Sequence, residues 1–136
     1  MKKVAVIAGY SGAGKTTAIE SLIRHYASAG VAVGVIKHTH HPLNEENKGD
    51  TARFLAAGAG PVILAGDGEA VIFRHNEPPA RMTFDAPADL LEPMTGEIVL
   101  IEGFKHQPAW PRVELTRNEW RTAAELVAIL DRIWRS

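Results

Sequence analysis

The run at residues 9–17, Gly-Tyr-Ser-Gly-Ala-Gly-Lys-Thr-Thr, constrains this chain more than any other feature of its sequence. It matches the phosphate-binding pattern G-x-x-x-x-G-K-[ST], and it lies between an apolar run at 4–8 and a segment with apolar residues at helical spacing. The glycines allow successive backbone N–H groups to point into one concavity, and the helix N-terminus adds partial positive charge there. The sequence therefore predicts a site for a nucleoside triphosphate.

The side chains of this loop have distinct expected partners. Lys15 would reach the β- and γ-phosphates and act in catalysis, Thr16 would give its hydroxyl to Mg²⁺, and Thr17 would donate to the α-phosphate. The residues expected to contact the nucleotide are Gly9, Ser11, Gly12, Ala13, Gly14, Lys15, Thr16 and Thr17.

Length and composition limit the classes of partner. A chain of 136 residues with 46% hydrophobic and 23% charged residues predicts one soluble domain, residues 1–136. A net charge of −1 gives no general attraction to nucleic acid or to an anionic membrane. No stretch approaches the roughly 18 apolar residues that a membrane span requires. The sequence has no cysteine, which excludes disulfides and fits a cytoplasmic location.

The rest of the chain alternates apolar runs with helical patterns. Such strands, apolar throughout and joined by helices, imply a mostly parallel sheet covered on both faces. The expected fold class is therefore an α/β P-loop NTPase with three layers, α/β/α. Its further expected elements are strands at 31–36, 61–65, 70–73, 98–101 and 113–115, a helix from Asp50 to Leu55, an irregular proline-rich segment at 75–87, a short helix capped by Asp85, and a C-terminal helix that Thr122 and Glu125 cap.

Ligands of such sheets bind at the carboxyl ends of the strands. Glu102 directly follows the apolar run 98–101, the placement of a Walker-B acid that holds Mg²⁺ directly or through water. We expect Thr16 and Glu102 to share the metal. The alternative is a strand-end carboxylate that only accepts hydrogen bonds from neighbouring backbone, and Gly103 would permit close backbone approach under either interpretation.

Asp50 has two competing interpretations. It can cap the helix that follows it. It can instead lie in a mobile loop, where it senses Mg²⁺ or orients a water for attack on the γ-phosphate, as a catalytic residue beside Lys15 and Glu102. Residues 47–50 also spell the guanine-reading pattern N-K-x-D. This copy follows the second strand, near the phosphate end, so we do not assign guanine recognition to it.

Basic side chains gather after the strands expected at 31–36 and 98–101. Histidines at i and i+2 on an extended chain point the same way, yet His38, His40 and His41 have no obvious fourth partner for a metal. A cationic patch for a second anion fits better, and solvated histidines without a ligand are the remaining alternative. The expected members of this patch are Lys37, His38, His40, Lys105 and His106.

Four segments together resemble one known family. They are the run at 9–17, Gly-Val-Ile-Lys-His-Thr-His-His at 34–41, Lys-Gly-Asp-Thr at 48–51, and Ile-Glu-Gly-Phe-Lys-His at 101–106. In this order they resemble the molybdopterin-guanine dinucleotide biosynthesis protein B family. The resemblance implies a protein that binds GTP and Mg²⁺, is often a homodimer, and assists the guanylyltransferase that attaches GMP to molybdopterin. It also suggests a molybdopterin-type ligand for the second anion site.

Three functions remain open from the sequence. One is an accessory GTPase of molybdenum cofactor biosynthesis, slow because no arginine finger is apparent in the chain. Another is a small-molecule kinase, for which only Arg74 and Arg81 are available to a lid over the phosphoryl group. The third is a non-catalytic adapter, in which GTP orders the loop around Asp50 for a partner.

Overall fold

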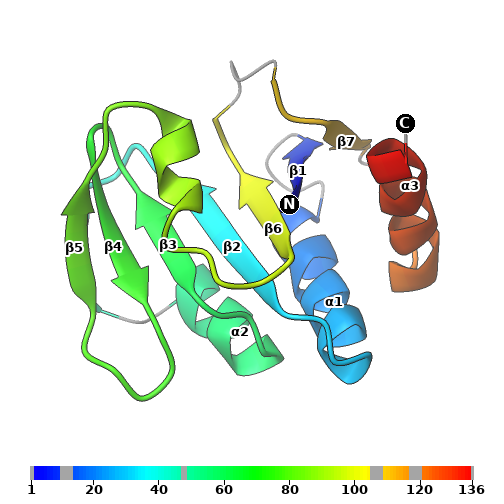
Figure 1. The fold of residues 1–136 in the computed structure, drawn as a ribbon, viewed down its shortest axis with the longest axis horizontal. Helices are drawn as coiled ribbons and strands as arrows, with labels where there is room; N and C mark the ends of the chain where they lie inside the picture. Colours follow the sequence, from blue (N-terminus) through cyan, green and yellow to red (C-terminus); the bar gives the residue numbers. More distant parts are fainter. Residues whose placement is uncertain (1, 10–13, 47–48, 105–108, 117–120, 136) are drawn as a thin grey trace.

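The computed structural model describes residues 2–9, 14–46, 49–104, 109–116 and 121–135. Seven strands of these residues form one sheet in the order β5-β4-β3-β2-β6-β1-β7, in which the β3–β4 and β4–β5 pairs are antiparallel and the other pairs are parallel (Figure 1). The elements in chain order are β1 (Lys3–Gly9), α1 (Lys15–Ser28), β2 (Val33–His38), α2 (Gly49–Ala57), β3 (Val62–Ala65), β4 (Glu69–Phe73), β5 (Ala80–Thr83), the 3-10 helix η1 (Pro87–Leu91), β6 (Ile98–Glu102), β7 (Arg112–Leu115) and α3 (Ala123–Arg135).

Successive residues of the central strands serve two separate hydrophobic clusters. In β2, Val33 and Val35 pack with the three α-helices, whereas Ile36 packs on the opposite face of the sheet. In β6, Leu100 belongs to the helix side and Ile101 to the opposite face. This alternation follows from the two-residue period of a pleated strand. It also determines which polar side chains at the strand ends share a face of the sheet.

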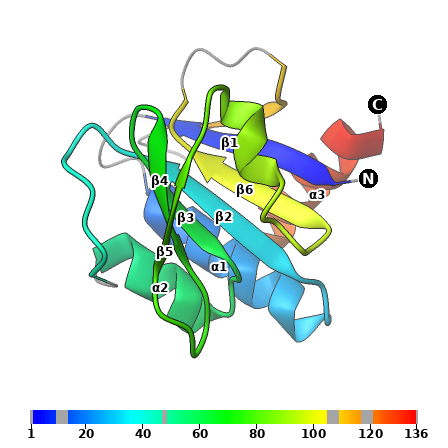
Figure 2. The same ribbon diagram turned by 60° about the vertical axis from the view of Figure 1, so that its left-hand side comes forward.

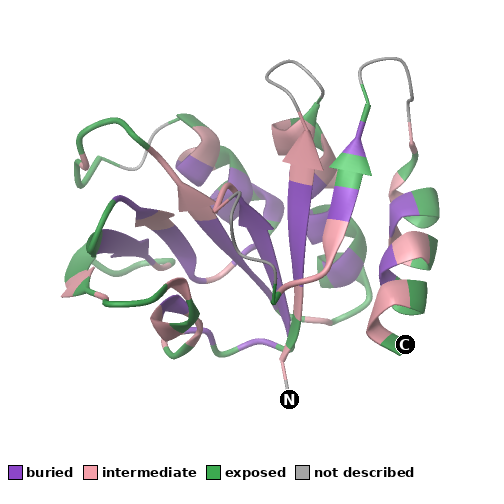
Figure 3. Ribbon diagram, turned by 90° about the horizontal axis from the view of Figure 1, so that it is seen from above, coloured by how far each residue is buried: buried purple, intermediate pink, exposed green. Residues whose placement is uncertain are grey.

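The two faces of the sheet are covered unequally. Of the helices in the described part of the chain, α1, α2 and α3 lie on one face and η1 lies on the other, as Figures 1 and 2 show. The middle strands are buried along most of their length, while each helix buries one stripe and exposes its outer side (Figure 3). The predicted class, α/β with a mostly parallel sheet, is confirmed. Its third layer is a single short 3-10 helix, packed through Leu90.

Most predicted elements are present, with small shifts of their bounds. The second strand occupies 33–38 instead of 31–36, because Val31 still belongs to the turn and donates its N–H to the carbonyl of Tyr26. The C-terminal helix has the predicted capping box: the backbone N–H of Glu125 donates to the Thr122 hydroxyl, and the Glu125 carboxylate accepts from the Thr122 backbone N–H. None of the described helices has the length and apolar character needed to cross a membrane.

Two local predictions in the proline-rich region are wrong. The segment 75–87, expected to be irregular, contains β5, which pairs antiparallel along the edge of β4. That pairing is a tertiary contact, which local composition does not reveal. Asp85 does not cap η1, since it precedes the N-cap position at Ala86. The cap comes from Asp89, whose carboxylate accepts the backbone N–H groups of Asp85 and Ala86, both at 3.0 Å.

Candidate nucleotide site

The carboxyl ends of β1, β2 and β6 lie side by side and aim at the start of α1. Lys37 and Glu102 are in register across the β2–β6 pair, and Glu102 is in register with Ile7 of β1 on its other side. Gly14 precedes α1 with φ +88, a left-handed conformation that glycine adopts without strain. Ser11, Gly12 and Ala13, which we predicted as nucleotide contacts, lie outside the described residues, as do Tyr10 and the first residue of the chain.

Four side chains from four different elements meet at this edge of the sheet. Thr16 of α1 donates its hydroxyl to Oδ2 of Asp50, at the start of α2, over 3.1 Å. Lys37 donates from Nζ to the same oxygen of Asp50, and its Nζ lies 3.7 Å from Oε2 of Glu102. We call Thr16, Lys37, Asp50 and Glu102 the polar cluster. Lys15 is half-buried and Thr17 is exposed on the same first turn of α1.

The polar cluster is partly withdrawn from solvent and carries two carboxylates. The Glu102 side chain is 12% exposed and that of Asp50 is 26% exposed. Burial by itself raises the pKa of Asp50, but hydrogen bonds from Lys37 and Thr16 and the charges of Lys37 and Arg53 outweigh it, so this pKa lies below its ordinary value. Asp50 is therefore ionised at neutral pH.

The donor set of the polar cluster fits a hard divalent cation. A threonine hydroxyl and two carboxylates supply oxygen ligands, which Mg²⁺ prefers. Oε2 of Glu102 is buried and accepts no hydrogen bond within the described part of the chain. A buried acceptor without a donor is costly unless another group satisfies it. A cation beside Glu102 would supply that interaction, so the predicted pair of Thr16 and Glu102 is compatible with a metal.

Asp50 does not cap a helix in the way that one interpretation held. α2 already begins at Gly49, so Asp50 lies within its first turn. Its carboxylate points instead to α1 and β2, where it accepts from Thr16 and Lys37. A carboxylate in the first turn still interacts favourably with the helix dipole. Asp50 thus connects the starts of α1 and α2 at the carboxyl edge of the parallel strands.

Lys37 does not belong to the predicted second anion site. His38, the next residue, faces the opposite side of the sheet, where its ring stacks on Phe104 with centroids 4.2 Å apart. His40 lies edge-on to His38 at 4.9 Å, so these two histidines do come together. The pleat places Lys37 with Val33 and Val35 on the helix side instead. The prediction grouped Lys37 with His38 because they are adjacent in the sequence. It overlooked that adjacent residues of a strand face opposite sides of the sheet.

The surroundings of His38 and His40 also include a carboxylate and a hollow. His38 also pairs with Asp67 at 3.3 Å, beside a hollow of about 300 Å³ between residues 39–43 and the β3–β4 turn. Lys105 and His106, the other predicted members, lie outside the described residues. Among the residues that the structure describes, no three histidine, aspartate or glutamate side chains are grouped to hold a metal.

Gly103 permits the close approach that the sequence suggested, but the partner in the structure is His38 and not a ligand. Gly103 has φ +103, and a Cβ built on it would lie 2.6 Å from Cβ of His38. Phe104 follows with φ +52, which is uncommon for a bulky residue. The sharp turn after β6 therefore sends Glu102 and Phe104 to opposite faces of the sheet. Phe104 also contacts Trp110 and Phe84 edge-on.

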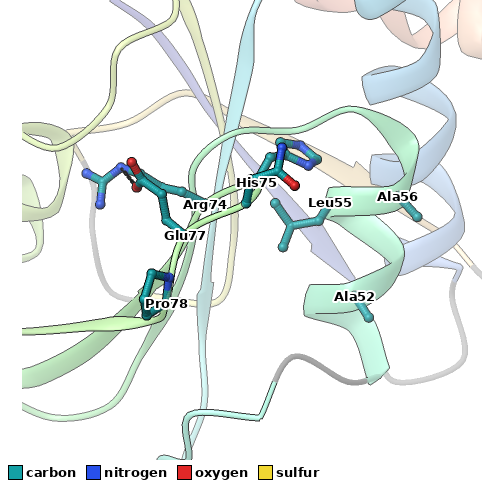
Figure 4. A pocket seen from close by; sticks show the side chains of 8 residues that line it. Ala52, Leu55, Ala56, Arg74, His75, Glu77 and Pro78 are labelled. Atoms are coloured by element: carbon teal, nitrogen blue, oxygen red, sulfur yellow. Dashed lines mark ion pairs between the residues drawn. The ribbon is translucent and has the colours of Figure 1, made fainter.

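A second hollow, of about 490 Å³, lies between α2 and the β4–β5 connection (Figure 4). Arg74 and His75 line it together with apolar side chains of α2. Because Phe73 pairs with Val62, at the start of β3, this hollow lies at the amino ends of the parallel strands. Arg74 pairs there with Glu77, and Arg81 pairs with Glu45 on the outer edge of the sheet. Neither arginine points to the polar cluster.

Known proteins resemble the chain both in sequence and in fold. A sequence model of the family described as molybdopterin guanine dinucleotide synthesis protein B matches residues 4–133. The molybdopterin-guanine dinucleotide biosynthesis adapter protein of Haemophilus influenzae is 40% identical over 83% of this chain, and that of Escherichia coli 31% over 74%. The crystal structure of Bacillus subtilis MobB superimposes with a TM-score of 0.52 at 22% identity, covering 99% of this chain and 97% of that one.

Fold and sheet order define an α/β protein with a mostly parallel sheet, the fold of the B. subtilis structure. The chain belongs to the molybdopterin guanine dinucleotide synthesis protein B family, as its sequence motifs suggested. It spans 62% of the length of the H. influenzae relative and 58% of the E. coli relative.

Proposed function

We propose that this chain binds Mg²⁺-GTP at the polar cluster and acts as an adapter in the assembly of molybdopterin guanine dinucleotide, with slow GTP hydrolysis. One observation carries the nucleotide part: Thr16, Asp50 and Glu102 converge at the start of α1, directly after a phosphate-loop sequence. The family and the names of the relatives support the adapter part.

Each residue has a role that follows from its position in this proposal. Lys15 contacts the β- and γ-phosphates as the main charge, as the phosphate-loop sequence predicts. Thr16 and Glu102 hold Mg²⁺, which neutralises charge on the phosphates when bound. Asp50 lies on the γ-phosphate side, where its ionised carboxylate can orient a water or report the presence of the metal.

The kinase alternative loses support from the positions of its two arginines. Arg74 lies at the amino ends of the parallel strands, and Arg81 is held by Glu45 at 3.0 Å. A lid over the transferring phosphoryl group would need a cation at the opposite, carboxyl edge. Arg81 is level with Lys37 in the strand register, but it lies on the outermost strand β5 and is paired with Glu45. Because neither arginine is paired with the polar cluster, slow hydrolysis fits this site better than transfer to an acceptor.

The proposal extends to partners and location. The partner is the guanylyltransferase that attaches GMP to molybdopterin, and the adapter works as a homodimer in the cytoplasm. A molybdopterin-type ligand would bind near His38 and His40, with Lys105 and His106 as further contacts. The stacked ring of His38 and the hollow beside it support this second site, since an anionic, planar ligand needs both charge and a flat surface.

Thermal-shift titration with GTP, ATP and candidate acceptors, followed by product analysis, tests the proposal. We expect GTP with Mg²⁺ to raise the melting temperature and to yield only slowly released free phosphate. Binding without turnover would identify a non-catalytic adapter. A phosphorylated acceptor would identify a kinase and overturn the proposal, as would the absence of any shift with GTP.

A further inference from the structure

The ammonium of Lys37 lies at the centre of the polar cluster. Its Nζ donates to Oδ2 of Asp50, the same oxygen that accepts the Thr16 hydroxyl, and is 3.7 Å from Oε2 of Glu102. The side chain of Lys37 is 25% exposed, so its charge is only partly screened by solvent. One cation therefore contacts Asp50 and approaches Glu102, and it shares the Asp50 oxygen with the Thr16 hydroxyl.

This placement follows directly from the sheet. Lys37 ends β2 in register with Glu102 of β6, and both side chains face the helix side, where Asp50 lies at the start of α2. No rearrangement of the backbone is needed to bring the ammonium between the two carboxylates. An ammonium offers three donors but one charge, whereas Mg²⁺ offers two charges to oxygen ligands alone.

We propose that Lys37 is the counter-ion of the metal-free site and makes metal binding depend on the nucleotide. This inference rests on the proposed function. The two carboxylates and Lys37 together carry a net charge of about −1, and Mg²⁺ entering alone would be repelled by the ammonium at close range. The phosphates of a bound nucleotide supply enough negative charge to balance both Lys37 and Mg²⁺. Lys37 then moves away from Asp50 and Glu102, whose oxygens become available to the metal.

A titration with Mn²⁺ in the absence of nucleotide tests this role, with the free ion followed by electron paramagnetic resonance. Lys37→Met removes the charge and keeps most of the side-chain volume. We expect this variant to bind Mn²⁺ at least about tenfold more tightly than the parent, since removing a like charge near 4 Å has an effect of that order or larger. Lys37→Arg keeps the charge and should retain the weak binding of the parent.

Two controls localise the effect. Arg81→Met changes the net charge of the protein equally but breaks only the exposed pair with Glu45, so its Mn²⁺ affinity should match that of the parent. The double variant Lys37→Met with Glu102→Gln should lose the gain, because the metal would lack its buried carboxylate. Should Lys37→Met not fold, Lys37→Gln, which keeps a donor for Asp50, undergoes the same titration.

Equal Mn²⁺ affinity of the parent and the charge-free variant would overturn the inference, because a merely structural ion pair would leave this affinity unchanged. So would a gain that persists in the double variant. The parent is also titrated with GTP present, where its Mn²⁺ affinity should rise. If GTP binds to neither protein while Lys37→Met still binds Mn²⁺ more tightly, the proposed function fails and the role of Lys37 as counter-ion stands.

Discussion

Lys37 and His38 are adjacent in the sequence and end on opposite faces of the sheet, in regions of different chemistry. Lys37 lies among oxygen ligands contributed by α1, α2 and β6. His38 lies among the aromatic rings of Phe104 and His40, on the face against which η1 packs. One edge of the sheet thus presents a charged, metal-compatible site on one side and an aromatic, weakly polar one on the other.

The difference shows how the pleat divides functional residues at a strand end. Basic residues that are neighbours in sequence cannot share one anion site if the strand continues through them, whereas residues two apart can. After β6 the cause is different: Gly103 and Phe104 both have positive φ, and this turn places Glu102 on the helix side and Phe104 on the other, although they are two residues apart. Two sites can therefore lie back to back at one edge, and substitutions on one side should leave ligand binding on the other unchanged.

The largest expected effect is a difference in GTP affinity between substitutions on the two faces of the sheet. Lys15→Ala should weaken GTP binding by about 3 kcal/mol, because it removes charged hydrogen bonds to two phosphates. His38→Ala should leave GTP affinity unaltered, since His38 faces away from α1. Calorimetric titration with Mg²⁺ present measures both. Comparable losses in the two variants would break the separation of the faces.

A second prediction concerns the turn after β6, which places Glu102 and Phe104 on opposite faces of the sheet. Gly103→Ala should lower the free energy of unfolding by about 2 to 3 kcal/mol, because it combines a left-handed φ with a Cβ 2.6 Å from that of His38. Gly30→Ala is the matched control. It has φ +76 but open space around its Cβ, so a loss of about 1 kcal/mol is expected. Denaturant unfolding measures both, and equal losses would show that the close approach to His38 is unimportant.

Much of the arrangement tested by these variants follows from the sequence, and the reasons for the exceptions are physical. The phosphate-loop pattern and the apolar runs predicted β1, α1 and β6, since periodicity and glycine placement are local properties. The role of Lys37 was missed because it depends on the register of β2 with β6. β5 was missed because its hydrogen bonds come from β4, and the 3-10 character of η1 because a short segment carries little periodic signal.

A smaller effect is expected for the metal on the helix side. Glu102→Gln should reduce the gain in GTP affinity that Mg²⁺ provides by about tenfold, because an amide oxygen carries no net charge for the cation. Asp50→Asn should lower the rate of hydrolysis more than the affinity. Titrations with and without Mg²⁺, together with phosphate release, distinguish these effects. Unchanged affinities and rates in both variants would remove the two residues from the site.

The smallest expected effect is that of removing the Tyr26 hydroxyl, which is a second buried oxygen on the helix side. Like Oε2 of Glu102, the hydroxyl of Tyr26 accepts and donates no hydrogen bond among the described residues. Tyr26 lies in the last turn of α1, in the hydrophobic cluster on the helix side and at the end of the helix opposite the polar cluster. Tyr26→Phe should therefore change the free energy of unfolding at pH 7 by less than about 1 kcal/mol, or raise it slightly, and should not alter GTP affinity.

The same substitution has a signature in alkaline solution. Burial, and secondarily the charge of Asp131, raises the pKa of Tyr26 to about 12. The folded state thus favours the neutral phenol, so its contribution is complete below the ordinary pKa near 10 and is lost as pH rises toward 12. Unfolding curves across this range should show a decline in the parent that Tyr26→Phe lacks. Parallel curves would contradict a buried phenol.

The most direct measurement is a crystal structure of the protein with Mg²⁺ and a non-hydrolysable GTP analogue. We predict phosphates at the start of α1, a metal about 2.1 Å from the Thr16 hydroxyl with Glu102 beside it, and Lys37 withdrawn from Asp50. Phosphates bound instead beside His38 and Phe104, or a metal held away from Thr16 and Glu102, would contradict the account.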